Sequence, residues 1–144
     1  MAWDTAELAR RFARPENKDL LTYLQHRGPS AHSNLGMLLY AAAPTLPGTA
    51  VFGPNPTACS YVFLHTHEGV AFAVALGMRS LVLRLPDAAR APAHAAGARA
   101  FPELSADWLV LDPFAAGRTK AQAAALVRRL LKAAHAHARD LAQG

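Results

Sequence analysis

The stretch that decides the fold is YVFLHTHEGVAFAVALGMRSLVLRL, residues 61–85. Its apolar residues fall into three segments: 61–67, 70–76 and 80–85. Short links, each with a glycine, separate the segments, and such links permit hairpins but are too short for parallel crossovers. Pro86 ends the third segment, because proline cannot donate a hydrogen bond within a ladder. The stretch therefore predicts three neighbouring strands in an antiparallel meander.

Helical patterns lie on both sides of this meander. Before it, caps and apolar spacing predict helices over 4–13, 17–27 and 34–43, although residues 37–40 are also compatible with a strand. The segments expected after it are a helix over 87–96, a strand over 107–112 and a helix over 119–142. The apolar stripe of the last helix consists of Ala123, Val127, Leu130, Ala134, Ala138 and Leu141.

These elements predict an α+β fold, with an antiparallel sheet of four or five strands, helices on one face and a long C-terminal helix. Alternation along the strands predicts that Phe72 and Val74 share a face. By the same rule, we expect one shared face for Leu81, Leu83 and Leu85. We expect another for Phe63, His65 and His67. Trp108 and the apolar stripe are expected to complete the core. A length of 144 residues fits one compact domain, in which 1–32 form a helical extension of 33–144.

Composition excludes several classes of protein. Apolar residues make up 52% of the chain, which argues against disorder, and no apolar run is long enough to span a bilayer. The N-terminus lacks the basic start and apolar stretch of a secretory signal. Cys59 is the only cysteine, so an intrachain disulfide is excluded and a cytoplasmic location is expected. We expect no membrane association.

The net charge of +5 is concentrated at the end of the chain, where residues 114–144 carry six Lys or Arg and one acid. Arg128, Lys132, His135 and Arg139 follow helical spacing and share one face of the last helix. Such a row could lie along phosphates. The alternative is a charged face that contacts only solvent.

The middle and end of the chain show a family pattern. It comprises VFG at 51–53, EGVAFAVALG at 68–77, LVLRLP at 81–86, GARAF at 97–101 and WLVL at 108–111. In this order, and followed by an alanine-rich helix, the segments resemble the TfoX N-terminal domain and the wider MmcQ/YjbR-like group. The resemblance covers roughly residues 33–142.

The resemblance implies a compact antiparallel sheet flanked by helices, and it brings no catalytic residues. Some members of the group are linked with regulation of competence genes and with DNA-binding-like folds. Two features depart from the pattern: the extension over 1–30 and the lengthened loop at 53–57. Function is not transferred by fold alone.

His65 and His67 are the candidate metal ligands. At i,i+2 on a strand, both imidazoles would project from one face and could occupy two positions on a zinc ion. Glu68 would point to the other face. The alternative is a strand end without metal. Cys59 could be a nucleophile, or it could be a buried and inert thiol. No cysteine motif surrounds it to support the nucleophile.

Motifs for catalysis and cofactor binding are absent from the sequence: there is no Gly-x-Ser-x-Gly elbow, no Walker loop and no Gly-x-Gly-x-x-Gly fingerprint. Residues 17–43 are a poor helix-turn-helix, since the link is long and the second helix is nearly uncharged. We therefore expect no enzyme and no cofactor. The expected function is a regulatory or binding domain with a nucleic-acid or protein partner, and the alternative is a small metal-binding protein. Homodimerisation stays open.

Overall fold

The computed structural model describes residues 5–27, 31, 33–53 and 61–143. Its sheet contains six strands in the order β1-β2-β3-β4-β6-β5, and all neighbouring strands are antiparallel. The strands are β1 (Thr49–Phe52), β2 (Val62–Thr66), β3 (Ala71–Leu76), β4 (Ser80–Arg84), β5 (Arg99–Ala100) and β6 (Trp108–Leu111). The predicted α+β class and the meander over 61–85 are confirmed. The sheet has more strands than the four or five expected, because the short β5 adds an edge beside β6.

Seven helical segments surround the sheet within the described residues. They are α1 (Thr5–Arg11), the 3-10 turn η1 (Pro15–Asn17), α2 (Lys18–Arg27), α3 (Ser33–Ala42), the 3-10 turn η2 (Ala43–Thr45), α4 (Asp87–Ala95) and α5 (Lys120–Gln143). Residues 37–40 are helical, so the strand alternative for them is wrong. The helix expected over 119–142 is present as α5, and Thr119 and Gln122 form a reciprocal capping box before it.

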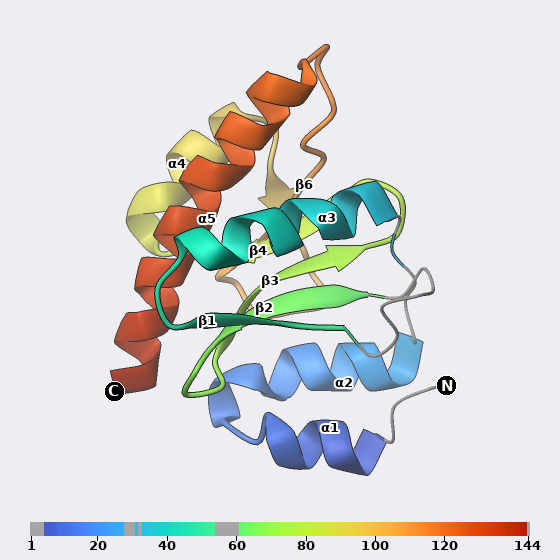
Figure 1. Cartoon of the computed structure of the whole chain (residues 1–144), viewed down its shortest axis with the longest axis vertical. Helices are drawn as coiled ribbons and strands as arrows, with labels where there is room; N and C mark the ends of the chain where they lie inside the picture. Colours follow the sequence, from blue (N-terminus) through green and yellow to red (C-terminus); the bar gives the residue numbers. More distant parts are fainter. Residues whose placement is uncertain (1–4, 28–30, 32, 54–60, 144) are drawn as a thin grey trace.

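The helices cover both faces of the sheet, which corrects the prediction of helices on one face. A large core lies between the sheet and α3, α4 and α5 and includes Leu35, Leu83 and Leu131. A small core lies between the sheet and the helices α1 and α2 and includes Phe12 and Trp108. Figure 1 shows α1 and α2 below the sheet and α3 and α5 on its other side. Because every strand from β2 to β4 is buried on both faces, both layers are needed.

Trp108 and the apolar stripe of α5 are both part of a core, as expected, but Trp108 belongs to the small core and the stripe to the large one. Its strand neighbours Leu109 and Leu111 face the large core instead. The stripe itself is confirmed from Ala123 to Ala138, which are buried along one side of α5, whereas Leu141 is only partly buried. Period-two alternation placed the strand residues relative to each other, but it could not say which layer of helices each face would meet.

A β-bulge in β3 corrects the expectation for Phe72 and Val74. Leu64 pairs with Ala73, whereas His65 pairs with Ala71, so Phe72 is an extra residue on β3. As a result, Phe72 and Ala73 both face the large core, and Val74 faces the small core. The bulge allows two consecutive side chains of β3 to fill the larger layer.

The N-terminal helices are attached to the sheet by packing and by polar contacts. The Phe12 ring lies edge-on to the rings of Phe52 and Phe63, with centroids 5.1 and 5.0 Å away. The Arg14 guanidinium donates hydrogen bonds to the carbonyls of Leu141 and Ala142, at the C-terminal end of α5. The extension expected over 1–32 therefore supplies part of the core. Since α2 and α3 lie on opposite faces, residues 17–43 form no helix-turn-helix.

Candidate functional site

The basic row on α5 is only partly exposed as predicted. Arg128, Lys132 and Arg139 are exposed, but His135 is 7% exposed. The imidazole Nε2 of His135 lies 2.8 Å from the carbonyl oxygen of Pro47, and its ring lies 5.7 Å from that of Phe72. His135 is thus a packing residue, because the row lies at the boundary between the buried and exposed sides of α5 and His135 is its member nearest the core.

We call Arg128, Lys132 and Arg139 the α5 basic row. Among the described residues, none of the three side chains forms an ion pair. Arg139 has an acid in its neighbourhood: its charge contributes to the lowered pKa of Glu68, after the backbone N–H of Glu68 itself and the Thr66 hydroxyl. Arg128 and Lys132 are therefore the members most available to an external anion.

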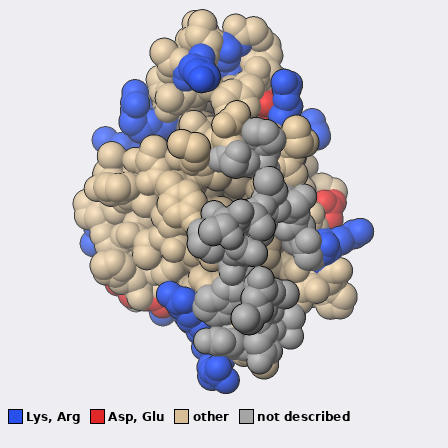
Figure 2. Space-filling view, turned by 45° about the vertical axis from the view of Figure 1, so that its right-hand side comes forward, with Lys and Arg blue, Asp and Glu red and all other residues tan. Residues whose placement is uncertain are grey.

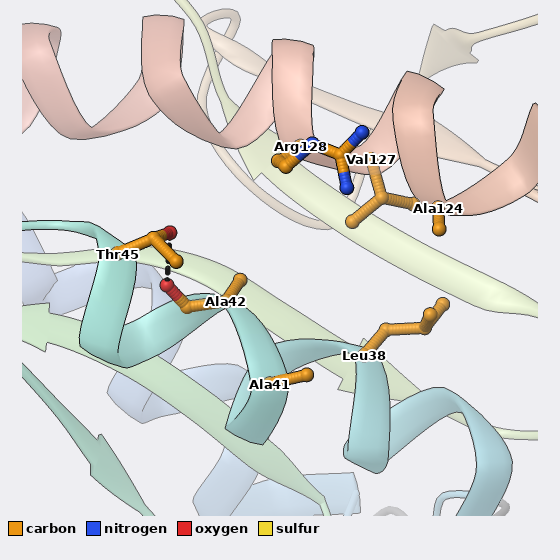
Figure 3. Close-up of a pocket in the computed structure, with 7 residues that line it drawn as sticks. All are labelled: Leu38, Ala41, Ala42, Thr45, Ala124, Val127 and Arg128. Atoms are coloured by element: carbon orange, nitrogen blue, oxygen red, sulfur yellow. Dashed lines mark hydrogen bonds between the residues drawn. The ribbon is translucent and has the colours of Figure 1, made fainter. Parts of the chain in front are cut away.

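A shallow groove of about 150 Å³ runs between α3 and α5, beside the N-terminal half of the basic row. Leu38, Ala41, Ala42, Thr45, Ala124, Val127 and Arg128 line it. Figure 3 shows Leu38 on one wall facing Ala124 and Val127 on the other, with Arg128 at the edge. The Thr45 hydroxyl donates a hydrogen bond to the Ala42 carbonyl at 2.6 Å, so the groove's polar wall group is already paired. Arg128 is its one charged lining residue.

The outer side of α3 is also uncharged. The helix contains no charged residue, and Met37 and Tyr40 are 65% and 45% exposed. Figure 2 shows a broad area without blue or red on the face that it presents, with both Lys or Arg and some Asp or Glu at its margin. The lining of the groove therefore combines apolar side chains with one cation, Arg128.

His65 and His67 do not share a strand face. The strand β2 ends at Thr66, and His67 lies in the following turn and is exposed, whereas His65 is 7% exposed. The His65 Nδ1 lies 2.7 Å from the Thr66 carbonyl, and its ring packs against Phe12 and Phe63. Burial lowers the pKa of His65. Within the described residues no three His, Cys, Asp or Glu side chains are grouped for a metal ion.

Sequence reasoning missed a buried polar cluster at the end of β4 and the start of β6. The Arg84 side chain, 6% exposed, forms an ion pair with Asp107 at 3.1 Å and stacks over Trp108 at 4.9 Å. Its Nη2 donates a hydrogen bond to the Glu16 carbonyl. Burial lowers the pKa of Arg84, and the Asp107 charge opposes that effect. A charged residue within an apolar run, as in LVLRL, was the available signal.

The chemistry of this cluster is structural. The Ser105 hydroxyl donates a hydrogen bond to Asp107 Oδ1 at 2.8 Å, and His137 Nε2 lies 3.7 Å from Asp107 Oδ2. A nucleophilic serine must instead contact the histidine, with the acid on the far side of the ring. Burial opposes ionisation of Asp107, but the Ser105 hydrogen bond and the Arg84 charge hold its pKa below the ordinary value. The carboxylate thus neutralises Arg84.

Comparison with known proteins gives no relative for this chain. No family model, curated protein or solved structure matches it. The resemblance to the TfoX N-terminal domain therefore rests on its sequence segments alone. Cys59, the remaining candidate, lies outside the described residues. None of the described helices is long and apolar enough to cross a membrane.

Proposed function

We propose that this chain is a non-catalytic binding domain that recognises an anionic macromolecule through the α5 basic row. The observation that carries the proposal is the exposure of Arg128, Lys132 and Arg139 without ion pairs among the described residues. Side chains that are already paired inside a fold cannot serve a partner, whereas exposed cations attract anions over a Debye length.

The spacing of the row supports an extended contact. Arg128 and Arg139 are eleven residues apart, which corresponds to about 16 Å along a helix at 1.5 Å per residue. Acidic residues are scarce on the same helix, where Asp140 is the single acid. An anionic partner along α5 would therefore meet attraction, and the nearest opposing charges are Asp140 and the Glu68 carboxylate near Arg139.

A regulatory role, as in some proteins of the TfoX and MmcQ/YjbR-like group, agrees with such binding. Membership of that group is a proposal that rests on the segments at 68–77, 81–86 and 97–101. The metal-binding alternative gains no support from the geometry, because His65 is buried and hydrogen-bonded while His67 is exposed in the turn after β2.

The test is a fluorescence-polarisation titration with a short labelled DNA duplex and with labelled polyglutamate, at salt between about 50 and 200 mM. The variant Arg128→Gln/Lys132→Gln/Arg139→Gln should weaken binding of at least one polyanion and flatten its salt dependence. Its control is Arg10→Gln/Lys18→Gln/Arg27→Gln, which removes three exposed cations from α1 and α2 on the opposite face. Binding of neither polyanion at low salt, or an equal loss in both variants, would contradict the proposal.

A further inference from the structure

We infer that the groove between α3 and α5 binds an acidic amphipathic segment of a partner protein, with an apolar side chain in the groove and a carboxylate on Arg128. This inference rests on the proposed function and names the class of its partner. It combines two observations on adjoining surfaces. They are the apolar lining between the helices and the cations beside it, which form no ion pair with any residue that the structure describes.

The lining selects an apolar anchor. Five of its seven residues are Ala, Leu or Val, and the Thr45 hydroxyl is already bonded to Ala42. A polar group placed there would find few partners, since only the acceptor side of the Thr45 hydroxyl and the Arg128 guanidinium remain. The volume of about 150 Å³ suits one large aliphatic or aromatic side chain, since a cavity of roughly this size accepts benzene.

The surrounding charge selects an acidic segment. Arg128 stands at the groove edge and Lys132 follows one turn later on the exposed side of α5, while α3 contributes no charge on the facing wall. A carboxylate placed one turn from the apolar anchor would reach these cations. An amphipathic helix provides that arrangement, because positions i, i+3 and i+4 lie on one side.

Other occupants fit the groove less well. A nucleic acid would find no aromatic ring among the lining residues on which to stack a base, and protein interfaces with nucleic acid are more polar than this groove. A second copy of the chain would bring its own net charge of +5 toward the basic row. A segment with carboxylates avoids both problems.

The experiment selects binders from a display library of random peptides of about sixteen residues, which allows four helical turns. The selected peptides are synthesised and titrated against two pairs of matched variants of the full chain. In the first pair, Ala124→Leu fills the groove and Ala125→Leu adds the same group outside it. In the second, Arg128→Glu reverses the groove-edge charge, and Arg129→Glu makes the same change beside α4.

The expected result is enrichment of peptides that combine Leu, Ile or Phe with Asp or Glu. Their affinity should fall about tenfold in Ala124→Leu and in Arg128→Glu and change little in the two controls. Circular dichroism and thermal melting establish that the variants are folded.

Several outcomes would overturn the inference. They are equal losses within each matched pair, selected peptides without acidic residues, and no enriched peptide at all. If no peptide is enriched while DNA binds through the basic row, the inference fails and the proposed function stands. If groove-dependent acidic peptides bind but the Arg128, Lys132 and Arg139 triple variant still binds polyanions normally, the proposed function fails separately.

Discussion

The carboxamide of Asn17 accepts a hydrogen bond from the backbone N–H of Ala71 at 2.9 Å, across 54 residues of chain. The same side chain, fully buried, donates to the carbonyls of Phe12 and Gly69 at 3.1 and 2.6 Å. Ala71 precedes the extra residue of the β3 bulge. One amide thus joins the link between α1 and α2 to the strand that the bulge distorts.

Replacing Asn17 should destabilise the whole fold. In Asn17→Ala, the Ala71 N–H and the two carbonyls lose their partner, and each unsatisfied buried group costs about 1–3 kcal/mol. We expect the free energy of unfolding, measured in urea, to fall by about 3 kcal/mol. Thr22→Ala, at an exposed position on α2, is the control and should change it by less than about 0.5 kcal/mol. A similar small effect of both would show that the amide bonds do not hold the extension.

The ion pair between Arg84 and Asp107 should show strong energetic coupling. Arg84→Met leaves the Asp107 carboxylate without its cation and the Glu16 carbonyl without its donor. Because Asp107 is one-quarter exposed and keeps the Ser105 hydrogen bond, the expected cost is about 1–3 kcal/mol. A double-mutant cycle of Arg84→Met with Asp107→Asn should give a coupling energy of about 1–3 kcal/mol by chemical denaturation. The exposed pair Arg79–Asp112, at 3.4 Å, provides the matched cycle and should give less than about 1 kcal/mol. Equal coupling in both cycles would refute the structural role assigned to Arg84.

The free energy of unfolding should fall as the pH drops below the pKa of an ordinary histidine. Burial lowers the pKa of His65 in the folded state, so the unfolded chain binds its proton first as the pH falls below about 6.5. His65 therefore contributes stability that is full above this pH and is lost progressively down to its folded pKa. Urea unfolding between about pH 5 and 7.5 should show this decline, and His65→Asn should flatten it.

Thr22→Ala supplies the control for this measurement, because it changes an exposed side chain on α2 that does not titrate. The slope of stability against pH should then resemble that of the unmodified chain. If the slope is the same in His65→Asn as in the unmodified chain, the assignment to His65 is wrong.

His135 should affect stability but leave anion binding unchanged. His135→Ala removes the contact with Phe72 and leaves the Pro47 carbonyl without the imidazole, at a cost of about 1–3 kcal/mol. Arg128→Gln should weaken anion binding but lower the free energy of unfolding by less than about 0.5 kcal/mol, because the side chain is exposed. Thermal unfolding and polyanion titration of the two variants test this separation. A clear loss of polyanion affinity in folded His135→Ala would show that His135 takes part in anion binding.

Much of the architecture was predictable from local pattern. The short glycine-containing links predicted antiparallel hairpins, and Gly69 and Gly77 adopt positive φ angles of 97° and 60° at those turns. Helical spacing over 119–142 predicted α5, and its apolar stripe is buried. These features depend on neighbours in the chain, so the sequence carries them directly.

The sequence indicated which residues form the basic row on α5, but only partly which of them are exposed. Helical spacing relates Arg128, Lys132 and Arg139, which are exposed, but it also includes His135, whose burial depends on Pro47 and Phe72 in distant segments. The groove depends on the approach of α3 to α5, and no spacing rule relates Leu38 to Val127. The bulge at Phe72 likewise has no signal in the alternating pattern.

The sequence by itself determined most of the helices, the antiparallel meander and the cationic character of the last helix. The tertiary structure decided that helices cover both faces, that Trp108 and α5 lie in different layers, and that His65 and His135 are buried. The physical reason is range: periodicity and turn preference act over a few residues, whereas burial results from contacts between segments far apart in the chain.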